Sequence, residues 1–222
     1  MPTRKTPFVN GQIYHVFNRG VNLNSVFFDK RDYERAIKLL EFYQVGDAPI
    51  RYSKFVKATG ELRKYFEESL KKMQRVVDLI CFCLMPNHFH LLLKQIEEDG
   101  IAKFVRNFQI GYSRYLNEKE KRSGALFQGQ FKAVRVENDE QLIHVSRYIH
   151  LNPYSSYLVK DLTELEKYPW SSYPEYIFDI DGICQKELIF SIFKRKEDYR
   201  KFILDNADYQ RKLERIKHLV LE

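Results

Sequence analysis

Cysteine is scarce in this sequence, and long apolar runs are missing. The three cysteines, Cys81, Cys83 and Cys184, cannot form a disulfide framework and lack the spacing of a zinc knuckle. The most apolar stretch, residues 79–85, has seven residues, whereas a membrane-spanning helix needs about 18. No apolar run that could serve as a signal peptide follows Met1. We therefore expect neither a secreted nor a membrane-spanning protein, and we expect a location in the reducing cytoplasm.

Acidic residues are outnumbered by basic ones. The 222 residues include 37 Lys and Arg against 30 Asp and Glu, which gives a net charge of +7 and a pI of about 9.1. Residues 101–135 hold eight basic and two acidic residues, so nearly the whole excess lies there. This concentration favours an anionic partner such as nucleic acid. The alternative is a helix face whose charges are merely solvated.

The pattern of apolar residues predicts alternating strands and helices. Apolar, β-branched and aromatic residues predict strands at 11–19, 76–85, 88–95 and 127–136. Helical periodicity and capping residues predict helices from Asp29 or Asp32 to about 43, from 101 to 120, and from 138 to 152, the last ended by Pro153. The order β-α-β-β-α-β-α is that of a ferredoxin-like α+β fold with an antiparallel sheet.

Composition divides the chain into a sheet-containing domain and an extension. We expect the domain to cover residues 8–155, with a charged helical insertion around 46–75 that follows the break at Gly46-Asp-Ala-Pro49. After residue 155, a segment rich in Tyr, Ser and Pro precedes two charged helices. We therefore interpret residues 156–222 as a mostly helical C-terminal extension.

Two histidines one residue apart, His88 and His90, lie on the predicted strand at 88–95. Residues i and i+2 of a strand point to the same face, so the two imidazoles are expected side by side. Two neutral imidazoles at this spacing can hold one divalent metal ion. The alternative is a pair of hydrogen-bonded histidines at the end of a sheet. Zinc hydrolases use the same spacing with acidic residues close by, whereas here Leu91-Leu92-Leu93 follows.

A tyrosine and an asparagine form a second pair on the third predicted helix. Tyr148 and Asn152 are four residues apart and therefore share one face of that helix. A phenol is a poor nucleophile at its usual pKa of about 10, but a metal that polarises the attacked phosphate, or a nearby base, makes it competent. The amide oxygen of Asn152 would complete a site of two nitrogens and one oxygen. The alternative for any one tyrosine is a half-buried core aromatic, as we expect for Tyr112 and Tyr115.

Together these motifs resemble a known family. His88-Phe-His90 within Met85–Leu93, with Tyr148–Pro153 downstream, is similar to the HUH single-strand DNA transposases with one catalytic tyrosine, and within them to the REP-associated tyrosine transposases. The resemblance spans about residues 8–175 and also includes Tyr14–Gly20, Gly124–Lys132 and Trp170–Ser172. It implies that His88, His90 and Asn152 bind a divalent metal, magnesium or manganese. It also implies that Tyr148 attacks a DNA phosphate to give a 5′-phosphotyrosine and a free 3′-OH.

Two features depart from the family pattern. The segment around 46–75 is longer than the usual connection, and Gln130 stands where many relatives carry an arginine. Two further histidines are auxiliary candidates: His15 would lie near the metal if its strand neighbours residues 88–95, and His144, one turn before Tyr148, would orient the phenol. A lone strand histidine is otherwise structural. The candidate contacts to the DNA backbone are Arg19, Lys103, Arg106, Arg114, Lys132 and Arg135.

The sequence thus predicts a metal-dependent enzyme that nicks and rejoins single-stranded, hairpin-containing DNA through a phosphotyrosine intermediate. Its expected role is transposition or the mobilisation of palindromic repeats, in the cytoplasm and associated with the nucleoid. The alternative is a domesticated regulator that binds DNA or RNA without cleaving it. A metal phosphoesterase for small molecules would leave the basic helix and Tyr148 without roles. The recognised hairpin, and whether the protein is a monomer or a homodimer, stay open.

Overall fold

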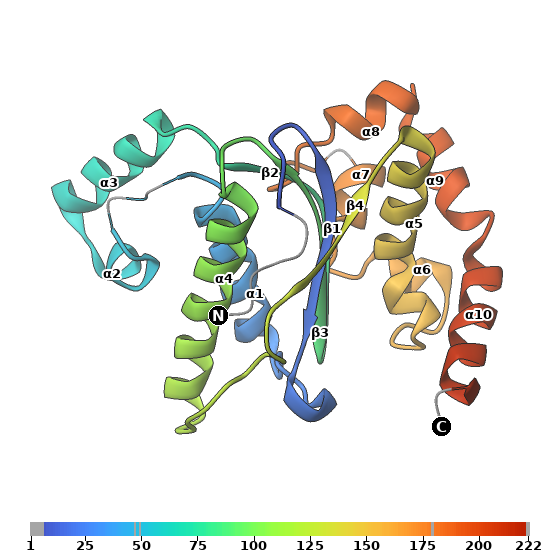
Figure 1. The fold of residues 1–222 in the computed structure, drawn as a ribbon, viewed down its shortest axis with the longest axis horizontal. Helices are drawn as coiled ribbons and strands as arrows, with labels where there is room; N and C mark the ends of the chain where they lie inside the picture. Colours follow the sequence, from blue (N-terminus) through green and yellow to red (C-terminus); the bar gives the residue numbers. More distant parts are fainter. Residues whose placement is uncertain (1–6, 47, 49, 179, 221–222) are drawn as a thin grey trace.

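Four antiparallel strands form the central sheet of the computed structural model, which describes residues 7–46, 48, 50–178 and 180–220 (Figure 1). The strands are β1 (Ile13–Arg19), β2 (Val77–Met85), β3 (His88–Gln95) and β4 (Lys132–Val136). Their order across the sheet is β2-β3-β1-β4, and each neighbouring pair is antiparallel. The connections and the strand order are those of the ferredoxin-like fold, so the predicted α+β class is confirmed.

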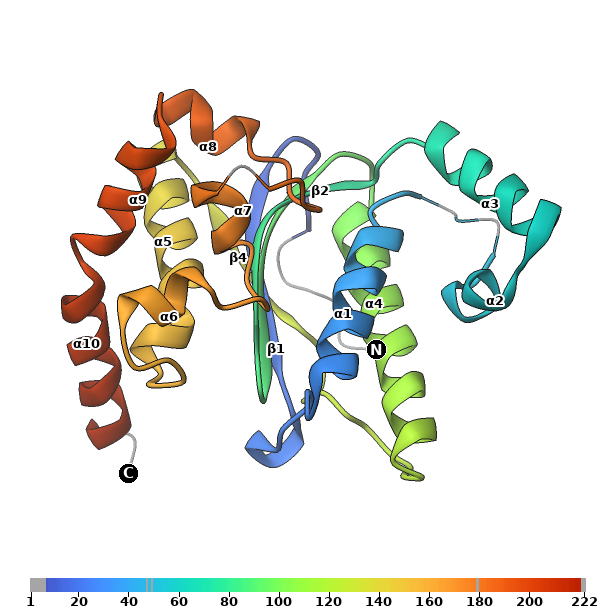
Figure 2. The same cartoon turned by 180° about the vertical axis from the view of Figure 1, so that it is seen from behind.

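Helices cover both faces of the sheet (Figures 1 and 2). α1 (Lys30–Phe42) and α4 (Gly100–Lys119) lie on one face, which we call the α1/α4 face, and α5 (Asp139–Ser155) lies on the other, the α5 face. α2 (Tyr52–Lys57) and α3 (Gly60–Lys72) extend outward beyond α1 and α4. On the α5 side follow α6 (Leu162–Glu166), α7 (Tyr173–Ile177), α8 (Glu187–Ile192), α9 (Lys196–Leu204) and α10 (Ala207–Val220).

Burial along the strands follows from these layers. β2 is buried at every position except Asp78, as expected for a strand covered on both faces. β1 alternates instead: Tyr14 and Val16 are buried toward the α1/α4 face, whereas His15 and Phe17 on the α5 face are half-buried. The α5 face is therefore closed over β2 and more open over β1 and the edge strand β4.

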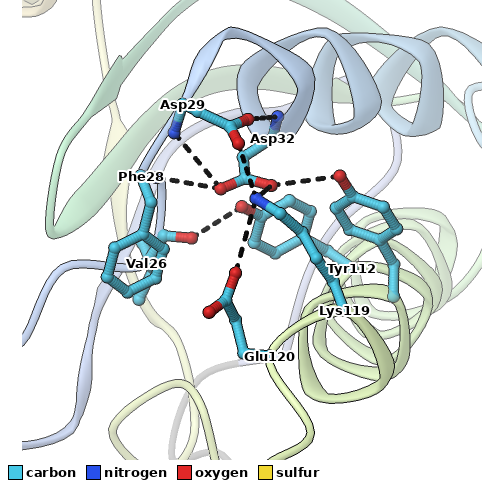
Figure 3. A network of polar contacts seen from close by, with 8 residues as sticks. Val26, Phe28, Asp29, Asp32, Tyr112, Lys119 and Glu120 are labelled. Carbon is cyan, nitrogen blue, oxygen red and sulfur yellow. Dashed lines mark hydrogen bonds and ion pairs between the residues drawn. The ribbon is translucent and has the colours of Figure 1, made fainter.

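A buried carboxylate ties α1 to α4 on the α1/α4 face (Figure 3). Asp29 caps α1 by accepting from the backbone N–H of Asp32. The Asp32 carboxylate accepts from the backbone N–H groups of Phe28 and Asp29, from the Tyr115 hydroxyl and from the Lys119 ammonium. These donors compensate the loss of hydration of a fully buried charge. The positive charge of Lys119 thus stabilises the fold by pairing with the Asp32 carboxylate.

The fourth strand is shorter than predicted. It begins at Lys132 rather than at residue 127, because the chain turns at Gly129, whose φ of 55° lies in the left-handed region. Phe127 lies outside the strand and forms an isolated bridge with Gly20.

The prediction that Pro153 ends the third helix is wrong, since α5 continues to Ser155. Pro153 lacks the backbone donor that would bond the carbonyl oxygen of Ile149, but only Tyr154 and Ser155 follow it in the helix. The helix therefore tolerates it at this position, and Asn152 lies inside the helix rather than at its end.

The predicted insertion contains α2 and α3. Asp47 and Pro49, which belong to the predicted break before this insertion, lie outside the described residues. Met1–Thr6, on which the expectation about a signal peptide rests, also lie outside them.

The C-terminal segment packs on β2. Ser171 forms a bridge with Cys83, and the backbone N–H of Leu84 donates to the carbonyl oxygen of Trp170, so this segment covers the outer edge of β2. The Trp170 ring stacks on Tyr33 with centroids 4.6 Å apart and is a packing contact. Three helices, α8 to α10, replace the two expected after residue 185. The domain boundary at residue 155 stays a prediction. No helix in the described ranges is long and apolar enough to cross a membrane.

Candidate active site

β3 carries the two histidines of the His-x-His motif on the α5 face. Their ring centroids lie 5.0 Å apart. His90 is buried, and His88 is half-buried at the start of the strand. Phe89 points to the opposite face, where it packs on Phe108 and Phe127. The alternation of the strand thus brings the two imidazoles together, as their spacing predicts.

Asn87 fixes the proton of His88. The Asn87 amide nitrogen donates to the carbonyl oxygen of Leu23 at 3.2 Å, and the amide oxygen lies 2.6 Å from His88 Nδ1. Because an amide oxygen only accepts, Nδ1 carries the proton and Nε2 carries the lone pair. From the sequence, Asn87 is identified only as a turn residue. Its position directly before His88 is the signal that could have indicated its contact with the motif.

His15 on β1 forms a hydrogen bond with His90. In the pairing of β1 with β3, Phe17 lies opposite His90, and His15 lies two residues away on the same face. His15 Nε2 is 2.9 Å from His90 Nδ1. Burial lowers the pKa of His15 to about 4, so its imidazole is neutral near pH 7. When His15 accepts this bond, His90 Nδ1 is the donor and His90 Nε2 carries the lone pair.

α5 places Tyr148 against the histidines. The centroid of its ring lies 5.4 Å from that of His90 and 5.9 Å from that of His15, both edge-to-face with interplanar angles of 85° and 70°. Asn152, one helical turn further, is buried. One helix thus brings a phenol and an amide to the face of the sheet that carries the imidazoles.

His150 anchors the same helix to the C-terminal segment. Its Nε2 lies 2.9 Å from Ser172 Oγ, and its Nδ1 lies 2.8 Å from the Tyr199 hydroxyl. Burial lowers the pKa of His150 to about 3, so the ring is neutral near pH 7. These contacts fix the position of α5, and through it the position of Tyr148.

The donor set on this face fits a divalent cation. In the described part of the chain, no three His, Cys, Asp or Glu side chains group so that they could hold a metal ion. A site at the motif therefore needs a third ligand of another kind, and the amide oxygen of Asn152 is such a ligand. Lone pairs at Nε2 of His88 and His90 are the form in which imidazole binds metals, and hydrogen bonds at the other ring nitrogen commonly orient such ligands.

The predicted DNA-contact residues divide between the two faces. Arg19 pairs with His88, and Lys132 pairs with Phe17, so both lie on the α5 face beside the motif. Arg135 pairs with Tyr14 and lies on the α1/α4 face, where it donates to the Gln12 side chain at 2.8 Å. The helix on that same face carries the others, Lys103, Arg106 and Arg114.

A basic groove of about 640 Å³ lies between α1, α2 and α4. Its lining includes Arg35, Arg51 and Arg114. The Arg35 guanidinium carbon lies 4.4 Å from the centre of the Tyr52 ring and 5.1 Å from that of Tyr115. The sheet separates this groove from Tyr148.

The C-terminal extension contacts α5 at Tyr148. The sequence does not predict this contact. Gln210 on α10 donates from Nε2 to the backbone oxygen of Tyr148 at 3.2 Å. His144 lies with its Nδ1 2.6 Å from Arg147 Nη2, and its ring packs on Phe202. No local pattern reveals which face of a helix an extension will cover, so only the structure finds this contact.

Known proteins are similar to this chain in sequence and in fold. Residues 50–152 match the profile of the family described as "Transposase IS200 like". The structure of a REP-associated tyrosine transposase bound to a REP hairpin is similar with a TM-score of 0.54 and 14% identity, covering 83% of this chain and 91% of that chain. A protein from Deinococcus radiodurans R1, provisionally assigned as a transposase, gives a TM-score of 0.34 and 16% identity over 67% of this chain and 95% of that chain, too low to carry weight. No curated protein matches the chain.

Proposed function

Because residues 50–152 match the IS200-like transposase family, we propose that this chain is a transposase that cleaves and rejoins single-stranded DNA through Tyr148. The observation that carries the proposal is the contact of the Tyr148 ring with His15 and His90, with Asn152 one helical turn away. A core tyrosine such as Tyr112, fully buried and bonded to a backbone carbonyl, has no such surroundings.

His88, His90 and Asn152 would hold a divalent metal ion, magnesium or manganese. When bound, the ion would polarise the attacked phosphate and stabilise the charge that develops on it. Asn87 and His15 are positioning residues in this proposal, because their hydrogen bonds select the tautomers of His88 and His90. His144 is a further candidate for holding α5 in place, through Arg147.

Tyr148 would be the nucleophile. Its phenolic oxygen forms a bond to phosphorus while the bond from phosphorus to the 3′ oxygen breaks. The phenol proton is released, and the leaving 3′ oxygen takes up a proton to become a hydroxyl. The product is a 5′-phosphotyrosine, which keeps the energy of the phosphodiester, so a second 3′-OH can reverse the step on another strand without a nucleotide cofactor. A flexible single strand can bring its phosphate in line with the phenol.

Arg19 and Lys132 would neutralise phosphates of the strand that enters the site, since they lie beside the motif. The cations on the α1/α4 face would contact DNA outside the site. A hairpin is the expected substrate, because the similar transposase of known structure is bound to one. A cytoplasmic, nucleoid-associated location follows as a prediction.

The direct test is formation of a covalent protein–DNA adduct. End-labelled single-stranded hairpins, taken from repeated palindromes that flank the coding region, are incubated with protein and manganese and separated by denaturing electrophoresis. A shifted band should form, disappear with a chelator and be absent from Tyr148→Phe. Tyr157→Phe is the matched control, since Tyr157 is near the same helix and 56% exposed. Tight binding by the wild type with no band would instead favour the regulator that does not cleave.

A further inference from the structure

A cavity of about 370 Å³ lies between α5 and α10, on the side of Tyr148 that faces the C-terminal extension. α5 contributes Arg147 and Tyr148, and the facing wall is formed by Asn206, Tyr209 and Leu213. The volume is within the range of about 300–1,000 Å³ typical of small-ligand sites. Because Tyr148 lines this cavity and also contacts His90, the cavity borders the candidate active site.

The two walls are held in place by contacts between the helices. Gln210 donates to the backbone oxygen of Tyr148, and the Tyr154 hydroxyl donates to Asp208 at 2.7 Å. The Arg211 guanidinium stacks on the Tyr154 ring at 4.1 Å. α10 is therefore fixed on α5 along the stretch that borders the cavity.

The lining combines an exposed aromatic shelf with a cation. Tyr209 and Leu213 are four residues apart on α10 and share one face, with 63% and 40% of their surfaces exposed. Across from them, the Arg147 guanidinium is held by the Phe202 carbonyl oxygen at 3.3 Å and by the Phe202 ring at 4.3 Å. Asn206 adds an amide that both donates and accepts. Among the described residues that line the cavity, none is a carboxylate.

We propose that this cavity binds the nucleotide next to the cleaved phosphate, with its base on Tyr209 and its phosphate near Arg147. Aromatic faces that stack bases and cations that contact phosphates are the two elements of single-strand binding sites. A base on Tyr209 must leave the stack of a duplex, so the cavity selects for single-stranded DNA. The proposal rests on the proposed function, because Tyr148 defines which phosphate is cleaved. It assigns the C-terminal extension a role in substrate binding.

The test compares the affinity of the full chain and its variants for a short fluorescein-labelled oligothymidylate, by fluorescence anisotropy at one low and one high salt concentration. Loss of stacking in Tyr209→Ala should weaken binding by about 5- to 150-fold. Tyr65→Ala is the matched control, because Tyr65 is 62% exposed on α3, on the opposite side of the sheet, and should bind like the wild type. Asn206→Asp, which keeps the shape but adds a negative charge, should also weaken binding, more at low salt than at high salt.

Thermal unfolding of each variant shows that the fold is kept. Wild-type affinity in both Tyr209→Ala and Asn206→Asp would overturn the inference. Adduct formation by the wild type, measured in parallel, separates the two proposals. An adduct with unchanged Tyr209→Ala binding overturns the cavity and leaves the cleavage reaction standing, whereas weakened binding without any adduct supports the cavity as a nucleotide site and overturns cleavage.

Discussion

The two faces of the sheet use buried polar side chains for different ends. On the α1/α4 face, the Asp32 carboxylate accepts from two backbone N–H groups, a hydroxyl and an ammonium, so the fold itself neutralises it. On the α5 face, His88 Nδ1 donates to the Asn87 amide oxygen, and when His90 Nδ1 donates to His15, the Nε2 of each neutral ring carries the lone pair. The first arrangement compensates a buried charge, and the second orients two imidazoles that would bind the proposed metal. Burial alone therefore does not identify a functional group.

The exposure of the side chains also differs between the two faces of the sheet. Tyr14 and Val16 on β1 are at most 3% exposed toward α1 and α4. On the α5 face, Val134 beside His15 is 58% exposed. The closed face supplies stability, while the partly open face leaves room for a strand of DNA next to Tyr148.

The largest expected effect concerns the open face. Replacing His88 and His90 together by alanine removes both nitrogen ligands, so adduct formation should fall by about 10³-fold or more. The rate is measured under single-turnover conditions, with manganese binding followed by calorimetry and the fold by circular dichroism. Undiminished nicking by the double variant in manganese would show that the histidines are structural.

On the closed face, Asp32→Ala should act on stability alone. It leaves the Tyr115 hydroxyl and two backbone donors without their acceptor and leaves Lys119 paired with Asp29, and the free energy of unfolding in urea should fall by about 3 kcal/mol. Adduct formation by the folded variant should match that of the wild type. Loss of the adduct at full stability would contradict the separation of the two faces.

His150 predicts a pH dependence. Burial lowers the pKa of the His150 imidazole from its ordinary value of 6.5 to about 3, so the unfolded chain binds the proton first as the pH falls. The folded state should lose about 1.4 kcal/mol per pH unit below 6.5 compared with His150→Gln, which cannot titrate. Urea unfolding of both proteins at one and at two pH units below 6.5 measures the difference. The contribution of His15 cancels because both proteins contain it, and equal pH dependence would refute the buried neutral imidazole.

The smallest effect concerns salt. Replacing Arg19 and Lys132 by glutamine should lower the slope of log affinity against log salt by about 1.4 for a single-stranded probe, about 0.7 per phosphate contact. The matched pair Lys103→Gln and Arg106→Gln on α4 lies outside the site, where a short single strand does not reach, and should leave this slope unchanged. The reverse result would move the single strand to the α1/α4 face.

The sequence predicts well where a periodic pattern decides the outcome. The alternation of β3 brings His88 and His90 to one face, and helical spacing puts Tyr148 and Asn152 on one side of α5. The predicted order of strands and helices was sufficient to identify the ferredoxin-like sheet. The roles of these residues in metal binding and cleavage stay predictions.

The sequence predicts poorly where distant segments meet. The bond from Gln210 to Tyr148 joins residues far apart in the chain, and no local pattern indicates it. The prediction that α5 ends at Pro153 is wrong, because a proline followed by only two helical residues disrupts little of the helix. Two of the predicted DNA-contact residues, Arg19 and Lys132, lie next to the motif. Only the strand register reveals this position.

Identification of the residue that becomes bound to DNA tests the central claim most directly. The adduct formed with manganese is digested with a nuclease and with trypsin, and the modified peptide is sequenced by mass spectrometry. Cleavage after Arg147 gives a peptide of residues 148–160, whose fragment ions distinguish Tyr148 from Tyr154 and Tyr157. We predict a nucleotide phosphate on Tyr148 alone. A nucleotide on any other tyrosine, or on no residue of this peptide, would contradict the assignment of the nucleophile.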